Sequence, residues 1–169
     1  YFNLNGQGKG LVFDHILFIN ADQYTPLDEE QIPTGAIEPV KGTALDFTTP
    51  TAIGDRIQEF STGYDHNYVL RKNGASEQPS LAAQVYEPES GRLMEVYTTQ
   101  PGMQFYSAHF IEGTVGREGY EYKSYEAFCL ETQHFPNSPN QAEFPSTLLE
   151  PEDIYEETTI YQFKVADGL

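Results

Sequence analysis

The sequence predicts an all-β domain built as an antiparallel β-sandwich. Short runs rich in aromatic and β-branched residues recur along the whole chain, which is typical of β-strands. Turn residues separate these runs, and the chain contains 11 prolines and 14 glycines. Residues 1–169 are expected to form a single domain, because this length supports a substantial core and no shift in composition marks a boundary.

Seven runs are expected to form the strands of this sandwich. They cover residues 16–19, 68–72, 81–87, 92–99, 104–110, 126–131 and 158–165. Turns are predicted at Asn73-Gly74 and at 100–102, and also at 88–91, where a loop joins two alternating runs into a hairpin. Residues 51–57 are predicted to form one or two helical turns at most, with Thr51 as the N-cap.

Two segments lack a regular pattern. Residues 22–50 form a long aperiodic stretch, which is either a functional loop or a loop that covers the sheet. The acidic segment at 150–157 is interpreted as a solvated connection before the last strand.

The charge of the chain limits its partners. There are 26 acidic residues against 9 basic ones, so the net charge is -17. Nucleic acids and anionic membranes are therefore not expected as partners, because binding phosphates requires clustered Lys and Arg. A phosphorylated substrate is disfavoured for the same reason, whereas neutral ligands are compatible with this charge.

Cysteine content and hydropathy bear on the cellular setting. Cys129 is the only cysteine, so no disulfide forms within the chain, and no Asn-x-Ser/Thr glycosylation site is present. These features favour a reducing, cytoplasmic location. No apolar run approaches the roughly 20 residues that a membrane-spanning helix needs. Because the chain opens on Tyr1, without Met or a signal-like segment, we expect residues to precede it.

Glu131 is the first candidate site residue. It follows an apolar run within Cys129-Leu130-Glu131-Thr132-Gln133-His134-Phe135-Pro136. Strand alternation places Phe128 and Leu130 on one face, and Cys129 and Glu131 on the other. If the second face lines a cleft, partial desolvation raises the pKa of Glu131 and suits it to general-base catalysis. The alternative is an edge acid that pairs with Lys or Arg.

The segment Gly63-Tyr64-Asp65-His66-Asn67 is the second candidate. It is interpreted as a polar turn directly before an apolar strand, a position that often contacts ligands. The carboxylate of Asp65 can accept hydrogen bonds from two hydroxyls, as a sugar diol offers. The alternative is an Asx turn in which Asp65 and Asn67 bond only to local backbone groups.

Gln104 is the third candidate, in a strand that follows Gln100-Pro101-Gly102. Its amide can donate to and accept from a hydroxylated ligand, while Phe105 or Tyr106 stacks on a sugar face. The alternative is a core strand with one satisfied amide.

Other kinds of site find little support. His15, His66, His109 and His134 lack the spacing of metal ligands, and Cys129 has no Cys-x-x-Cys partner, so no metal site is expected. The chain has no Gly-x-Ser-x-Gly, no Gly-x-Gly-x-x-Gly and no P-loop.

Eight blocks in a fixed order resemble the aldose 1-epimerase (galactose mutarotase) family. The blocks are Tyr1-Phe2-Asn3-Leu4, Ala21-Asp22-Gln23-Tyr24-Thr25-Pro26, Ile32-Pro33-Thr34-Gly35, Gly63-Tyr64-Asp65-His66-Asn67, Ser90-Gly91-Arg92, Thr98-Thr99-Gln100-Pro101-Gly102, the block from Cys129 to Pro136, and Phe144-Pro145-Ser146. The likeness covers essentially all 169 residues. It implies that the chain forms the C-terminal part of a large antiparallel β-sandwich with an open sugar cleft.

The resemblance also implies an activity and the roles of single residues. Family members interconvert the α- and β-anomers of free aldoses such as galactose and glucose, without a cofactor. By this resemblance Glu131 is the general base, Asp65 and Gln104 contact sugar hydroxyls, and Tyr1 lies at the edge of a substrate-contact segment. General acid–base chemistry of this kind needs a base and an acid on opposite sides of the anomeric centre.

The sequence departs from the family pattern at its start. The acid histidine of the family lies two residues before the Tyr-Phe-Asn-Leu block, which would place it just before Tyr1. The N-terminal half of the family fold would precede it and is expected as the structural partner of this chain. The isolated 169 residues are therefore expected to lack mutarotase activity.

Two alternative functions remain open from the sequence. One is a non-catalytic carbohydrate-binding module on the same fold. The other is a related hexose-phosphate epimerase, which the acidic charge disfavours.

Overall fold

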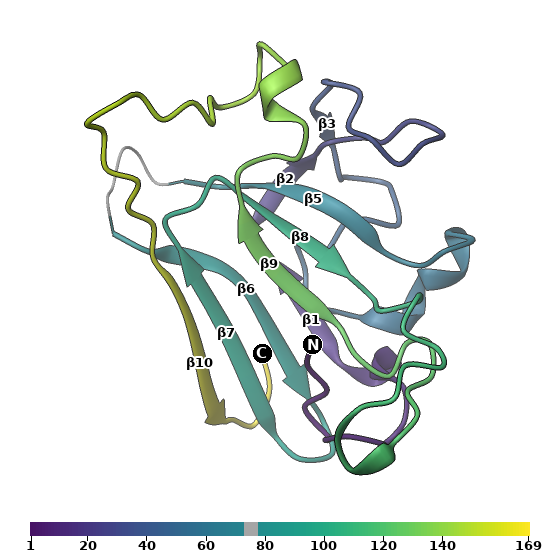
Figure 1. Cartoon of the computed structure of the whole chain (residues 1–169). Coiled ribbons are helices and arrows are strands. Elements are labelled where there is room, and N and C mark those ends of the chain that lie inside the picture. The colour runs from purple at the N-terminus through teal and green to yellow at the C-terminus, as the bar shows by residue number, and fades with distance from the viewer. Residues whose placement is uncertain (73–77) are drawn as a thin grey trace.

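The chain folds into two five-stranded antiparallel sheets, in a computed structural model that describes residues 1–72 and 78–169 (Figure 1). The strand order is β10-β7-β6-β1-β4 in the first sheet and β3-β2-β5-β8-β9 in the second. The strands are β1 (Ile16–Ile19), β2 (Ala21–Tyr24), β3 (Glu38–Pro39), β4 (Thr51–Ala52), β5 (Asp65–Leu70), β6 (Ser80–Glu87), β7 (Arg92–Thr98), β8 (Gly102–Tyr106), β9 (Cys129–Gln133) and β10 (Thr159–Val165). Single turns of 3-10 helix lie between them: η1 (Val12–Asp14), η2 (Ile53–Asp55), η3 (Ile57–Glu59), η4 (Arg117–Gly119) and η5 (Ser138–Asn140).

One hydrophobic core cluster joins the two sheets. The first sheet contributes Leu17, Val85 and Met94 to it, and the second contributes Tyr68 and Phe105. All five side chains are fully buried. Burial of a side chain of this size stabilises the fold by roughly 1.5–3 kcal/mol. The prediction of an all-β, antiparallel fold is confirmed.

Each predicted strand has a counterpart, but three of them lie at shifted positions. β5 covers 65–70 rather than 68–72, β8 covers 102–106 rather than 104–110, and β9 covers 129–133 rather than 126–131. Ala108 and Tyr125 have φ angles of 53° and 66°, which interrupt the extended backbone after β8 and before β9. Neither residue type signals such a conformation, so these strand ends are wrong in the sequence prediction.

Three short strands are not predicted from the sequence. β2, β3 and β4 contain only two to four residues each. Pairing with distant segments holds them in place: β2 lies between β3 and β5, and β4 pairs with β1. The segment 22–50 therefore contributes to the edge of the second sheet, although most of it is irregular.

The predicted helical turns at 51–57 are only partly correct. Thr51 begins β4 and does not cap a helix, because its hydroxyl donates to the carbonyl of Thr49 at 2.8 Å. The turns that follow, η2 and η3, are of the tighter 3-10 type, and no side chain in the described part of the chain caps either of them. Pairing of Thr51 with Leu17 on β1 takes the place of the predicted cap.

The hairpin at 88–91 is confirmed. Glu87 and Arg92 close it as a cross-strand pair, and the amide of Gly91 donates to the carbonyl of Glu87 at 2.9 Å. Gly91 has a φ of 68°, a conformation that glycine adopts without strain. The other predicted turn, at Asn73-Gly74, lies outside the residues that the structure describes.

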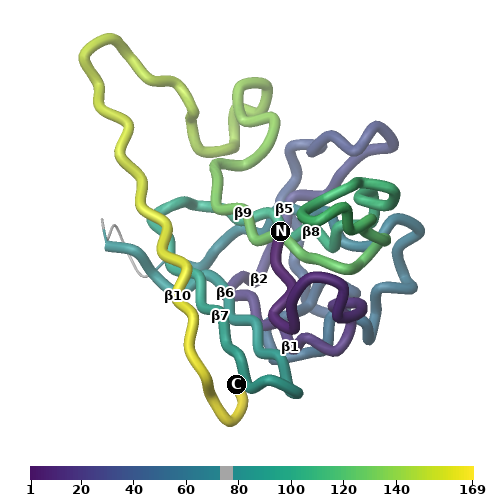
Figure 2. Tube along the Cα trace, turned by 60° about the horizontal axis from the view of Figure 1, so that its bottom comes forward, coloured from purple at the N-terminus to yellow at the C-terminus, as the bar shows by residue number. Residues whose placement is uncertain are grey.

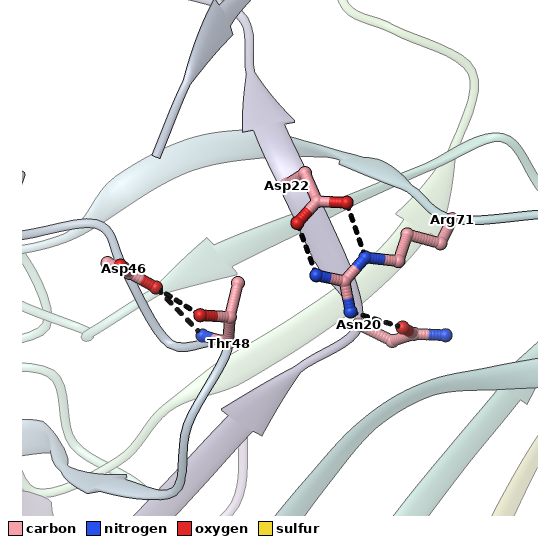
Figure 3. A network of polar contacts seen from close by, with 5 residues as sticks. All are labelled: Asn20, Asp22, Asp46, Thr48 and Arg71. Atoms are coloured by element: carbon pink, nitrogen blue, oxygen red, sulfur yellow. Dashed lines mark hydrogen bonds and ion pairs between the residues drawn. The ribbon is translucent and has the colours of Figure 1, made fainter. Parts of the chain in front are cut away.

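A polar network fastens β2 to β5 (Figure 3). The register of this strand pair shifts between Ala21 and Gln23, so Asp22 lies in a β-bulge. The guanidinium of Arg71 binds both carboxylate oxygens of Asp22 and donates to Asn20 Oδ1 at 3.2 Å. These hydrogen bonds hold the pKa of Asp22 below its ordinary value. Because the pair is exposed, it contributes about 0–1 kcal/mol to stability.

Part of the segment between β9 and β10 leaves the body of the fold before the chain returns as β10. Figure 2 shows this stretch as an arc beyond both sheets. β10 then forms the edge of the first sheet, beside β7. Its apolar side chains remain open to solvent, with exposed fractions of 56% for Phe163 and 76% for Val165. An apolar edge strand of this kind is a surface that another protein segment can cover.

Two further results concern the described residues alone. None of the helices found there has the length and apolar character of a membrane span. The described part of the chain also contains no cluster of three or more His, Cys, Asp or Glu residues that could hold a metal ion.

Candidate functional site

Three adjacent strands of the second sheet bring the predicted polar residues together. β5 pairs with β8 so that Asn67 faces Gln104, and β8 pairs with β9 so that Gln104 faces Glu131. Asp65 and Tyr106 form a neighbouring pair on the same face, because residues two apart in a strand point the same way. The site is therefore a property of the sheet and not of one loop.

The opposite face of the same strands belongs to the core. Tyr68 and Phe105 are fully buried, Phe128 has no exposed surface, and Leu130 is 2% exposed. The predicted alternation is seen for Leu130, which is buried, and Glu131, which is exposed, but Cys129 on the face of Glu131 is buried as well.

A shallow hollow of about 360 Å³ opens over the polar face. Its lining combines two carboxylates, two side-chain amides and three aromatic rings with a proline: Tyr1, Asp65, Gln104, Tyr106, Phe110, Glu131, Gln133 and Pro136. All four residues predicted to form a site lie in this lining.

Glu131 carries a carboxylate without a hydrogen-bonded or ion-paired partner among the described residues. The ion pairs found there are Arg71–Asp22 and Lys164–Glu95, so the predicted alternative of a Lys or Arg partner is not seen. Partial burial raises the pKa of Glu131 above its ordinary value, and the nearby charge of Asp65 raises it further. A raised pKa brings the carboxyl closer to the range in which it both takes and returns a proton.

Asp65 and Gln104 are directly bonded, since Gln104 Nε2 donates to Asp65 Oδ1 at 2.7 Å. The prediction of a turn at this point is wrong, because Asp65 and the two residues after it are part of β5 and pair with β8. Nor does the carboxylate of Asp65 form an Asx turn; its described partner is a side chain 39 positions away in sequence. The Asp65–Gln104 pair is placed to meet hydroxyl groups, because it offers both acceptors and donors.

Tyr1 and Tyr106 form the aromatic wall of the hollow. Their rings meet edge to face, with centroids 6.3 Å apart, and Tyr1 is 74% exposed. Of the two residues proposed to stack on a ligand, Phe105 lies in the core and only Tyr106 lines the hollow.

None of the four histidines lines the hollow. His15 accepts a hydrogen bond from the amide of Leu4, and burial lowers its pKa to about 4. His66 lies beside Phe60, and burial lowers its pKa to about 4 as well. His109 contacts the ring of Tyr106, and burial lowers its pKa below the ordinary value. A proton donor to match Glu131 is therefore not found among these side chains.

Gln133 lines the hollow, although the sequence prediction assigns it no role in the site. It lies two positions after Glu131 on β9, so it points to the same face. The period of two along β9 is the signal that could have identified it.

A larger hollow of about 780 Å³ shares Tyr1, Tyr106 and Phe110 with the first. Its single acidic lining residue, Glu126, is already bonded to the hydroxyl of Tyr120 and the amide of Lys123. Its described lining therefore offers no unpaired carboxylate, and the smaller hollow is the better candidate for general-base chemistry.

The fold and the hollow together define an all-β protein that carries carboxylates and amides on one open sheet face. The sequence profile of the aldose 1-epimerase family matches residues 1–162, and the chain belongs to this family. The family that the eight sequence blocks resemble is therefore confirmed.

Individual relatives agree with this assignment. The chain is 48% identical over 168 residues to galactose mutarotase of Sus scrofa and 37% identical over 170 residues to aldose 1-epimerase of Escherichia coli K12. These matches cover 98% and 96% of the chain but 48% of each relative, so the chain spans about half the length of these proteins. A solved GalM/aldose epimerase homologue from C. elegans superposes with a TM-score of 0.87 at 28% identity, over 98% of this chain and 49% of that one.

Proposed function

We propose that this chain provides the half of an aldose 1-epimerase that carries the general base, and that Glu131 is that base. The observation that supports the proposal is an unpaired carboxylate with a raised pKa in a hollow with the Asp65–Gln104 pair. In the proposed reaction the Glu131 carboxylate removes the proton from the C1 hydroxyl of a free aldose. The C1–O5 bond breaks as an acid protonates O5, which gives the open-chain aldehyde.

Inversion follows from rotation about the C1–C2 bond before the ring closes. O5 then attacks the other face of the aldehyde and loses its proton, while Glu131 returns its proton to the oxygen on C1. After ring opening and ring closure, the enzyme has its original protons and the sugar its original atoms, so no cofactor is consumed. A base and an acid that exchange roles in this way are most effective when each pKa lies near the working pH.

The acid is proposed to come from sequence that precedes Tyr1, as the family resemblance implies. The half-length match to the relatives supports this proposal. The same upstream half is proposed to cover the exposed edge of β10 and to complete the cleft around Tyr1. The chain alone is then expected to lack activity.

Asp65 and Gln104 are proposed to bind sugar hydroxyls, and Tyr1 to border the substrate. No Lys or Arg belongs to the described lining of the hollow, which favours a neutral aldose over a hexose phosphate. On the single, buried cysteine, Cys129, we also propose a reducing, cytoplasmic location.

A non-catalytic sugar-binding role is the second candidate, because no histidine lines the hollow. Substitution of Glu131 separates the two functions. In the full-length protein that contains this chain, Glu131→Gln should lower kcat for mutarotation, followed by polarimetry, by about 10²–10⁴-fold and change sugar affinity much less. Glu143→Gln makes the same chemical change at an exposed position outside the hollow and should leave both unchanged. Sugar binding without any turnover in the unsubstituted protein would favour the binding module.

A further inference from the structure

We infer that Gln133 is a positioning residue, which orients the amide of Gln104 and through it the carboxylate of Asp65 toward a hydroxylated ligand. The ligand part of this inference rests on the proposed function, whereas the orienting part rests on the hydrogen bonds alone.

Gln133 is the centre of a network of side-chain amides. Its Nε2 donates to Gln104 Oε1 at 3.3 Å and to Asn67 Oδ1 at 3.4 Å. A primary amide nitrogen carries two hydrogens, so one group can serve both acceptors. Gln133 thus binds one residue of β8 and one residue of β5 from its place on β9.

The network has a single consistent direction. Gln104 Nε2 donates to Asp65 Oδ1, and a carboxylate can only accept, so the carbonyl of Gln104 must face Gln133. Gln133 must then present its NH₂ group to that carbonyl. The same NH₂ group also donates to Oδ1 of Asn67. The Nδ2 of Asn67 is therefore free to donate to the hydroxyl of buried Thr25, at 3.3 Å.

Gly102 gives Gln133 the space to reach across the sheet. Gln133 faces Gly102 on β8, and Gly102 faces Val69 on β5. A Cβ atom at Gly102 would lie 2.7 Å from Asn67 Oδ1 and 2.9 Å from the ring of Phe135. Only a residue without a side chain therefore allows the Gln133–Asn67 contact over β8.

This orientation determines what the hollow presents to a ligand. Gln104 occupies Oδ1 of Asp65 and leaves Oδ2 without a hydrogen-bonded partner among the described residues. The second hydrogen of Gln104 Nε2 is a donor next to that acceptor. An adjacent donor and acceptor match a hydroxyl, which accepts one hydrogen bond and donates another. If the amide of Gln104 turned over, two acceptors would face each other and the pair would be lost.

Reversal of the network tests the orienting role by thermal melting of this chain. Gln133→Glu places a carboxylate against two carbonyl oxygens and should lower Tm by roughly 3–6 °C. Adding Asp65→Asn should recover more than half of that loss in the double variant, because the amide introduced at this position can donate to a reversed Gln104 amide. The control Gln58→Glu adds the same charge at an exposed position and should leave Tm within about 1 °C.

The two single variants and the double variant form a double-mutant cycle. Charge repulsion between positions 65 and 133 would also couple the two substitutions, so this cycle is repeated in a protein that carries Gln104→Met. Coupling that passes through the Gln104 amide should vanish in that background. Additive effects in the first cycle, or coupling that survives Gln104→Met, would overturn the inference.

Kinetics of the full-length protein test the ligand part. Gln133→Met should raise KM for the aldose about tenfold, as expected for a misplaced hydrogen bond to a charged group. The kcat should change by less than about threefold, because Glu131 is not hydrogen-bonded to the network. An unchanged KM in an active enzyme would overturn the positioning role and leave the proposed reaction intact. Coupling through Gln104 in a protein without turnover would support the orientation and refute the reaction.

Discussion

Two glutamates on strands of different sheets have opposite surroundings. Glu95 on β7 is buried, accepts a hydrogen bond from Gln84 at 2.7 Å and pairs with Lys164 at 2.9 Å. Burial alone would raise its pKa, but the bonds from Lys164 and Gln84 outweigh burial and hold the pKa below the ordinary value. Glu131 on β9 has no such partner within residues 1–72 and 78–169, and burial with the nearby Asp65 raises its pKa.

Both glutamates lie on strands, so a position on a strand does not by itself determine whether the pKa of a glutamate is raised or lowered. A carboxylate whose partners are supplied by neighbouring strands stabilises the fold and resists protonation. A carboxylate left without a cation is destabilised as an anion and is therefore available to accept a proton. The two sheets thus separate an acid that neighbouring side chains bind from the acid that we propose as the general base.

Giving Glu131 a cation should make it resemble Glu95. Gln104 faces Glu131 directly, so Gln104→Lys places an ammonium group beside the carboxylate. The pKa of Glu131 should fall below its ordinary value, and mutarotation by the full-length protein should slow by about 100-fold or more. Polarimetry measures the rate, with Gln58→Lys as the control for added charge. An unchanged rate would mean that the free carboxylate is not the base.

Removing the cation from Glu95 should have a smaller effect, on stability alone. Lys164→Met leaves a buried carboxylate with Gln84 and Tyr97 as its remaining described partners and should lower the free energy of unfolding by about 1–2 kcal/mol. Urea denaturation measures the loss. Lys41→Met removes the same charge from an exposed position and should cost no more than about 0.5 kcal/mol. Equal losses in both variants would show that the Glu95 pair contributes nothing specific.

The smallest expected effect is a gain in stability on removal of Glu131. Because the folded-state pKa of Glu131 is raised, ionisation favours the unfolded state, and stability is lost as pH rises through the unfolded value toward the folded one. Glu131→Gln should therefore be more stable at pH 7 by at most a few tenths of a kcal/mol, since the side chain is largely exposed. The gain should disappear well below the unfolded pKa. A loss of stability at pH 7 would indicate a stabilising partner for Glu131.

The pH dependence of Glu95 has the opposite sign. Its lowered pKa contributes stability above the unfolded value, and that stability is lost as pH falls through the folded one. Acid denaturation followed by circular dichroism should therefore be less steep in Lys164→Met than in the unsubstituted chain.

Local patterns were sufficient for much of the fold. The alternation around Leu130 and Glu131 fixes which side chain enters the core, because residues one apart in a strand face opposite ways. The hairpin at 88–91 follows from its turn residues. The bends at Ala108 and Tyr125 could not be predicted, because neither residue type favours a positive φ; a hydrogen bond from the amide of Tyr125 to the carbonyl of Ala108 joins the two bends at 3.1 Å.

The site was predictable in its residues but not in its connections. Glu131, Asp65 and Gln104 are recognisable from their blocks, yet their meeting depends on the register of β5, β8 and β9. The role of Gln133 depends on the missing side chain of Gly102 on the next strand. The Glu95–Lys164 pair joins residues 69 positions apart, so no local pattern identifies it (164 − 95 = 69).

Titration of the carboxyl carbons of Glu131 and Glu95 by ¹³C NMR, in one sample of this chain, compares the pKa values of the two glutamates under the same conditions. We expect a pKa above the ordinary glutamate value for Glu131 and below it for Glu95. A pKa for Glu131 at or below that of Glu95 would contradict the claim that β9 carries an unpaired carboxylate suited to proton transfer.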